Sequence, residues 1–132
     1  MTITISCHCG ANRIELPRPP ERAAECNCTY CAKTGAVWGY YQPEDLRVIS
    51  ADEERIYDPN NMNRHHFCGR CGGNLYNDTP DWGSLYNMDG TLKNPDGEQM
   101  PTQRSIGINL RLADNFNWTV LEIEKLNGRN SW

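Results

Sequence analysis

Hydrophobic and polar residues alternate in short runs along most of this chain. Alternation with a period of two is typical of strands that bury one face. It occurs at 2–6, 13–16, 37–41, 46–49, 74–76, 106–110 and 118–123. No stretch keeps a 3.6-residue period for three turns, so we expect only short helical segments, the best of them at 29–33. The pattern predicts a mainly β domain built from short antiparallel strands.

Clusters of Gly, Pro, Asn and Asp separate these runs, at 17–20, 58–61, 71–74 and 94–97. Residues 52–55 are predicted to form a solvated turn. The segment 78–103 is rich in the same turn-forming residue types and is expected to be a long excursion, either a lid or a surface loop. The whole chain, residues 1–132, has the length of a single domain.

Charge and hydropathy exclude several classes of protein. The formal net charge is −4 and the basic residues are scattered, which disfavours binding to nucleic acid. No apolar run approaches the roughly 20 residues needed to cross a bilayer. The first residues lack the basic stretch and apolar core of a secretory signal. We therefore expect a cytoplasmic protein without a membrane partner.

Seven cysteines form three tight clusters, Cys7-x-Cys9, Cys26-x-Cys28-x-x-Cys31 and Cys68-x-x-Cys71. An odd number of cysteines and a reducing compartment disfavour a disulfide framework. Cysteines this close together also strain the geometry of a disulfide bond. Thiolates select zinc, copper(I) or iron–sulfur clusters, and paired knuckles in a chain rich in hairpins favour zinc.

The cysteine count divides into four plus three. Structural zinc normally has four protein ligands, whereas catalytic zinc has three and an open position. The two pairs, Cys7 with Cys9 and Cys68 with Cys71, can close one tetrahedral structural site, and each pair is followed by a glycine. The third cluster then offers three thiolates and an open corner that can activate a substrate thiol. In the alternative arrangement, a histidine or a carboxylate fills this corner and the site is also structural; the histidines available are His8, His65 and His66.

Three motifs carry a resemblance to a known family. They are Cys7-His-Cys-Gly-Ala, Cys26-Asn-Cys-Thr-Tyr-Cys-Ala-Lys-Thr-Gly-Ala and His66-Phe-Cys-Gly-Arg-Cys-Gly73. In this order and spacing they resemble the glutathione-dependent formaldehyde-activating enzyme family, which also includes centromere protein V. The segments 108–114 and 127–132 look like the later strands and tail of that family. The resemblance implies a zinc-stapled domain of short sheets and β-coils, related to methionine-R-sulfoxide reductases and a Rab exchange factor.

The resemblance also implies a reaction and the roles of the cysteines. Cys7, Cys9, Cys68 and Cys71 would hold a structural zinc, and Cys26, Cys28 and Cys31 a catalytic one, giving two zinc ions per chain. The family's reaction joins glutathione and formaldehyde into S-(hydroxymethyl)glutathione, which is carbon–sulfur lyase chemistry. Attack by the thiolate on the carbonyl leaves an alkoxide that needs a proton. His66 and Tyr30 are the candidates to supply it.

Glutathione carries two carboxylates, so its site should present cations. The basic residues considered for this role are Lys33, Arg64, Arg70 and Arg111. Five aromatic residues are candidates either for a pocket lining or for packing; they are Trp38, Tyr40, Tyr41, Trp82 and Tyr86.

Two other functions compete with the lyase. One is a non-catalytic zinc module that binds a protein partner. The other is a methionine sulfoxide reductase, which needs a nucleophilic cysteine outside the zinc ligands. That reaction is disfavoured because no cysteine follows Cys71.

Overall fold

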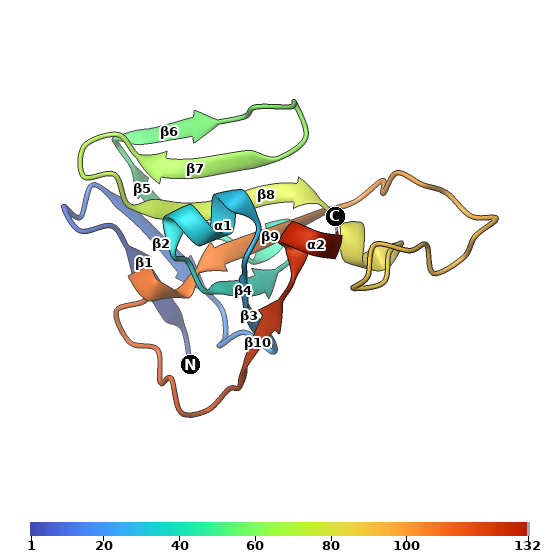
Figure 1. The fold of residues 1–132 in the computed structure, drawn as a ribbon. Helices are drawn as coiled ribbons and strands as arrows, with labels where there is room; N and C mark the ends of the chain where they lie inside the picture. The colour runs from blue at the N-terminus through green and yellow to red at the C-terminus, as the bar shows by residue number, and fades with distance from the viewer. Residues whose placement is uncertain (132) are drawn as a thin grey trace.

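Residues 1–131 are described in the computed structural model, and Trp132, the last residue of the predicted tail, lies outside the described part. The chain forms ten short strands and two short α-helices within these residues (Figure 1). They are β1 (Ile3–Ser6), β2 (Asn12–Leu16), β3 (Ala23–Cys26), α1 (Thr29–Thr34), β4 (Trp38–Tyr41), β5 (Arg47–Ala51), β6 (Glu54–Tyr57), β7 (Arg64–Cys68), β8 (Asn74–Pro80), β9 (Arg104–Asn109), β10 (Ile123–Leu126) and α2 (Gly128–Ser131). The expected mainly β fold is confirmed. Neither helix is long or apolar enough to cross a membrane.

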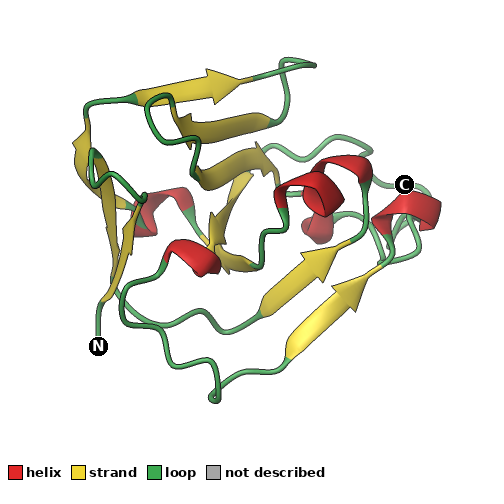
Figure 2. Cartoon of the chain, turned by 60° about the vertical axis from the view of Figure 1, so that its left-hand side comes forward, coloured by secondary structure: helices red, strands yellow, loops and turns green. Residues whose placement is uncertain are grey.

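Two sheets make up the fold. The smaller has the order β1-β2-β5, and the larger has the order β10-β3-β4-β9-β8-β7-β6. Within residues 1–131, every strand pairing is antiparallel except the one between β10 and β3, where Ile123 faces Ala23 and Leu126 faces Cys26. These two strands run side by side at one edge of the large sheet (Figure 2). The single departure from the expected antiparallel arrangement arises because β10 returns to this edge through a long connection rather than a hairpin.

The hydrophobic core lies between the two sheets. Ile3 and Ile5 of β1 and Ile14 and Leu16 of β2 alternate with more exposed neighbours and are at most 2% exposed. From the large sheet, Ile106 and Ile108 of β9 pack against the same cluster. The period-two pattern of the sequence therefore reports the core face of each of these strands.

The prediction of a strand at 118–123 is wrong. Residues 118–121 form turns and bends, and β10 begins only at Ile123. The side chain of Asn117 accepts hydrogen bonds from the amide and hydroxyl of Thr119, at 3.0 and 2.7 Å. This local turn competes with extended pairing and leaves Val120 61% exposed.

The expected helix at 29–33 is confirmed as α1. Cys28 is its N-cap, and the Cys28 sulfur accepts a hydrogen bond from the Cys31 amide at 3.4 Å. Gly35 ends the helix in the left-handed conformation, with φ of 69°. The expected excursion begins later than 78, because β8 continues to Pro80, and it then projects from the large sheet as a loop (Figure 1).

Candidate metal centres

The four cysteines of the two pairs lie together. Cys7 and Cys9 follow β1, Cys68 ends β7, and Cys71 lies in the turn after it. All four sulfurs lie within 4.8 Å of one another. The Cys7 and Cys9 sulfurs are 3.7 Å apart, and the Cys9 and Cys68 sulfurs are 3.6 Å apart. A tetrahedral zinc with Zn–S bonds of about 2.3 Å requires sulfurs about 3.8 Å apart, so this group could hold a metal ion.

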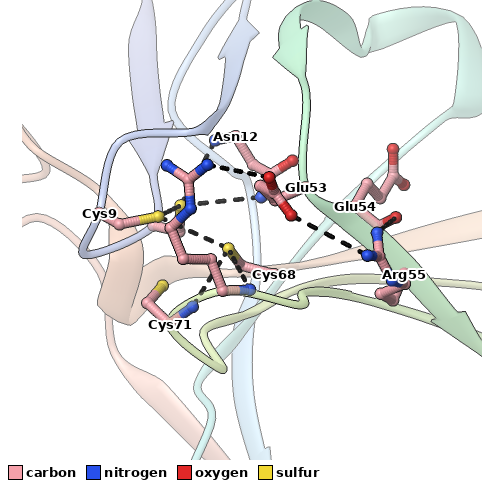
Figure 3. A network of polar contacts seen from close by, with 9 residues as sticks. Cys9, Asn12, Glu53, Glu54, Arg55, Cys68 and Cys71 are labelled. Atoms are coloured by element: carbon pink, nitrogen blue, oxygen red, sulfur yellow. Dashed lines mark hydrogen bonds and ion pairs between the residues drawn. The ribbon is translucent and has the colours of Figure 1, made fainter.

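Tight turns and amide groups shape this four-cysteine cluster. Gly10 and Gly72, each just after a cysteine pair, have φ of 80° and 79°, which a side chain would disfavour. The Asn12 amide donates to the Cys7 sulfur at 3.4 Å, and the Arg70 amide donates to the Cys68 sulfur at the same distance. The amide of Cys71 also donates to the Cys68 sulfur (Figure 3). These hydrogen bonds favour the thiolate form that a metal ligand needs.

The thiol pKa values in this cluster diverge. Amides of Cys9 and Gly73 lower the pKa of Cys71 to about 6. Although the Ala11 amide lowers the pKa of Cys9, desolvation and the other three sulfurs together raise it to about 11. Four adjacent thiolates repel one another unless a cation lies among them. The donor set therefore fits a divalent, thiolate-binding metal.

The remaining three cysteines form a second group. Cys26 ends β3, Cys28 caps α1 and Cys31 lies in its first turn, with the sulfurs within 4.8 Å of one another. No fourth Cys, His, Asp or Glu within residues 1–131 joins this group. The indole nitrogen of the buried Trp38 donates to the Cys31 sulfur at 3.3 Å, a contact that the sequence did not predict. Burial is the main cause that raises the pKa of Cys31, to about 12.

None of the three histidines belongs to the three-cysteine cluster. His66 contacts Glu54 through Nδ1 and stacks on Tyr76, with ring centroids 4.1 Å apart. His65 Nδ1 lies 2.7 Å from Asn77 Oδ1. His8 is exposed in the turn between Cys7 and Cys9. The alternative in which a histidine fills the open corner therefore has no support from the geometry.

Strand register places His65 and His66 on opposite faces of the large sheet. His65 pairs with Asn77, Asn77 with Gly107, and Gly107 with Tyr40, so these residues share one face of the large sheet. Trp38, two residues before Tyr40, lies on the same face and contacts Cys31. His66 pairs with Tyr76, which pairs with the core residue Ile108 on the opposite face. The face that carries the three-cysteine cluster thus carries His65 and not His66.

Tyr30 lies between α1 and this sheet face. Its ring stacks on His65 with centroids 3.8 Å apart, and its hydroxyl donates a long hydrogen bond of 3.5 Å to Asn74. Burial raises the pKa of Tyr30 to about 12, with a further contribution from the Cys31 and Cys28 thiolates. The phenol is therefore held in its protonated form beside the three-cysteine cluster.

The basic residues suggested by the sequence lie in different places. Arg70 is beside the four-cysteine cluster, with its guanidinium 2.9 Å from Glu53. Arg64 lies 4.0 Å from Asp58 and 3.8 Å from Asp78 at the far end of β7. Lys33 is exposed in the last turn of α1. None of these three lines the groove next to the three-cysteine cluster.

That groove has a volume of about 430 Å³ and is lined by both Cys26 and Cys31. Arg111 also lines it, with Nε donating to the Gly35 carbonyl at 2.8 Å. Its polar rim also includes Glu25 and Asn27, on either side of Cys26, and Lys125 and Asn127, which sequence analysis missed. Lys125 and Asn127 lie at the groove because β10 pairs with β3. The sequence predicted a strand at 118–123 instead of β10, so this pairing was not predicted.

A larger cavity of about 940 Å³ lies next to the groove, and Leu126 lines both. Of the aromatic residues considered in the sequence, four line this cavity, namely Tyr40, Tyr41, Trp82 and Tyr86. Trp38 instead packs against the sheet beneath Cys31.

Comparisons with known proteins agree with the fold and with the family that the sequence resembles. A protein of Halomonas elongata named for glutathione-dependent formaldehyde activation is 28% identical over 133 residues, covering 92% of this chain and 82% of that protein. The crystal structure of a Rhodobacter sphaeroides protein has a TM-score of 0.64 and 25% identity, covering 95% of this chain and 99% of the other. The sequence model of the family described as "Glutathione-dependent formaldehyde-activating enzyme" matches residues 2–106. This chain belongs to that family.

Proposed function

We propose that the protein is a zinc-dependent carbon–sulfur lyase that joins a thiol such as glutathione to an aldehyde such as formaldehyde. One observation supports this most directly: three cysteine sulfurs converge beside a groove, and no fourth ligand from residues 1–131 joins them. Zinc bound there would supply a position at which a substrate thiol loses its proton readily. The family description, with its glutathione and formaldehyde, supports the same reaction.

The groove suits a polar peptide-like thiol. Arg111 makes no ion pair within the described residues, so its guanidinium can receive a carboxylate. Lys125 also lies at the rim, where Glu25, another lining residue, already compensates its charge, so Arg111 is the cation left for a carboxylate. Asn127 adds an amide donor, whereas its Oδ1 already accepts hydrogen bonds from Asn27 and Asn130. These groups would orient the thiol so that its sulfur points toward Cys26 and Cys31.

The alkoxide formed by attack on the aldehyde needs a proton. Tyr30 lies beside the cluster and keeps its phenolic proton at neutral pH. Tyr40 shares the same sheet face, and burial raises its pKa to about 12. His66 remains a sequence prediction for this role, but it lies on the opposite face with Glu54. Tyr30 is therefore the better supported of the two original candidates.

The four-cysteine cluster has a different proposed role. It joins the turn after β1 to the turn after β7, and Cys9 and Cys68 are 59 residues apart in sequence. Closing so long a loop restricts the unfolded chain and stabilises the fold. We assign this cluster a structural zinc, giving two zinc ions per chain.

The rate of adduct formation tests the proposal. Zinc-loaded wild type, Cys28→Ser and the control Thr29→Ser are compared by NMR exchange at about pH 6.5, where only about one glutathione thiol in a hundred is ionised. Serine preserves the helix cap at position 28, so only the thiolate is lost. We expect wild type and Thr29→Ser to accelerate the reaction and Cys28→Ser not to. Fully zinc-loaded wild type that is no faster than buffer would favour the non-catalytic, partner-binding module.

A further inference from the structure

The larger cavity, lined by Tyr40, Trp82, Tyr86, Met88 and Leu126 among others, is apolar and aromatic over much of its wall. Tyr40 reaches it from β4, and the loop after β8 supplies the two other rings and the methionine. Trp82 and Tyr86 meet edge to face, with centroids 5.9 Å apart. Such a wall binds an apolar or aromatic group better than a charged one.

The cavity adjoins the three-cysteine cluster. Leu126 lines both the cavity and the groove, and it is the cross-strand partner of Cys26. Tyr40 lines the cavity from the sheet face on which Trp38 contacts Cys31. A molecule that reacts near Cys26 can therefore extend a substituent past Leu126 into the cavity.

Charge distinguishes the larger cavity from the groove. The only cations among the described lining residues of the cavity are Arg18 and Arg22. Arg18 makes two hydrogen bonds to Asp45, at 3.1 and 3.0 Å, and Arg22 makes two to Glu124, both at 3.0 Å. Both guanidinium groups are thus already compensated by carboxylates. The two carboxylates of glutathione fit the groove with Arg111 better than they fit this cavity.

Size argues against formaldehyde as the ligand for which the cavity is shaped. Formaldehyde has two non-hydrogen atoms, and about 1.5 kcal/mol per atom is the ceiling for very small ligands. Its binding free energy therefore cannot exceed roughly 3 kcal/mol, which is weaker than a millimolar dissociation constant. A cavity of about 940 Å³ instead has the size of a typical small-molecule site.

Building on the proposed function, we propose that this cavity binds the apolar substituent of the carbonyl substrate, and that this substrate is an aromatic aldehyde. The thiol sulfur bonds to the carbonyl carbon, and the π electrons of the carbonyl group move to oxygen. That oxygen takes up one proton, matching the proton lost by the thiol. The product is a thiohemiacetal, no redox partner is needed, and the reverse reaction is the lyase direction.

Binding of benzyl alcohol, an unreactive analogue of benzaldehyde, tests the cavity without any turnover. Calorimetry on the zinc-loaded protein compares wild type with Ser105→Leu, which places a larger side chain into the cavity from β9. Ser50→Leu is the matched control, because Ser50 is a half-buried strand serine outside the cavity. We expect affinity to fall at least 10-fold in Ser105→Leu and to be unchanged in Ser50→Leu. Trp82→Ala, which removes an aromatic wall instead of filling space, should weaken binding several-fold.

Measurements of aldehyde turnover then test whether the molecule bound in the cavity is a substrate. With glutathione as the thiol, Ser105→Leu should lower kcat/KM for benzaldehyde at least 10-fold more than it lowers kcat/KM for formaldehyde. Absence of benzyl alcohol binding to wild type, or its displacement by glutathione, would overturn the inference even if formaldehyde is turned over. Binding with no turnover of any aldehyde would instead refute the proposed lyase, and with it the identification of the ligand as a substrate.

Discussion

Replacing Trp38 by phenylalanine should weaken metal binding at one cysteine cluster and leave the other intact. Trp38 is 3% exposed, and its indole N–H donates to the Cys31 sulfur at 3.3 Å. Phenylalanine keeps an aromatic ring on β4 but removes this donor. The hydrogen bond favours the Cys31 thiolate against the burial that raises the pKa of this thiol.

The size of the effect follows from the kind of hydrogen bond lost. A hydrogen bond to a charged group contributes about 1.5–3 kcal/mol. If the full amount applies to the metal-bound thiolate, affinity falls roughly 10- to 150-fold, since about 1.4 kcal/mol corresponds to tenfold. The loss of donors that hold metal ligands in other proteins, about 10- to 100-fold, lies in the same range.

Competition with a coloured chelator measures this effect. Wild type should release zinc in two phases, and Trp38→Phe should shift only the weaker phase by about that factor. Trp82→Phe is the control, because Trp82 lies in the larger cavity rather than beside a cysteine. An unchanged profile in Trp38→Phe, or a shift in both phases, would refute the reasoning that this N–H stabilises the Cys31 thiolate.

Two further predictions concern stability. A Cβ added at Gly39 would lie 3.0 Å from a methyl group of Leu110. Gly39→Ala should therefore lower the free energy of unfolding by about 1–3 kcal/mol in chemical denaturation, and by less in a Leu110→Ala background. Equal losses in both backgrounds would contradict this contact. The hydrogen bonds from Arg18 lower the pKa of Asp45, so the pair stabilises the fold above about pH 4 and less as pH falls through the lowered pKa. Asp45→Asn should therefore cost about 0.5–1 kcal/mol at pH 7 and little near pH 2, whereas a difference independent of pH would argue against the pair.

Sequence patterns predicted the strands in which apolar and polar residues alternate and missed the strands without that alternation. Ile3 and Ile5, or Ile106 and Ile108, alternate with polar residues and report their buried face directly. β3 contains Ala23-Ala24-Glu25-Cys26 and β7 contains Arg64-His-His-Phe-Cys68, which carry no such alternation. β6 was also missed, because Glu54 and Arg55 resemble a solvated turn that in fact ends at residue 53. Cross-strand neighbours, and not local pattern, make these segments into strands.

The sequence likewise predicted some features of the candidate site and missed others. Cysteine spacing is a local property, and the structure groups the sulfurs four and three, as the count suggested. Which histidine shares a face with the three-cysteine cluster depends on strand register, so the adjacent residues His65 and His66 cannot be distinguished by sequence position alone. Arg111, a candidate from the sequence, reaches the groove from the turn that follows β9. Lys125 and Asn127 reach it only because β10 pairs with β3. Their role was therefore not readable from the sequence.

The central claim is that the three-cysteine cluster holds a zinc ion with an open coordination position, and that the substrate thiol binds at this position. Zinc content per chain, with glutathione titrated calorimetrically into wild type and Cys28→Ser, tests it most directly. We expect two zinc ions in wild type and one in Cys28→Ser, with glutathione binding lost together with the second ion. A single zinc in both proteins, with no glutathione binding to either, would contradict the claim.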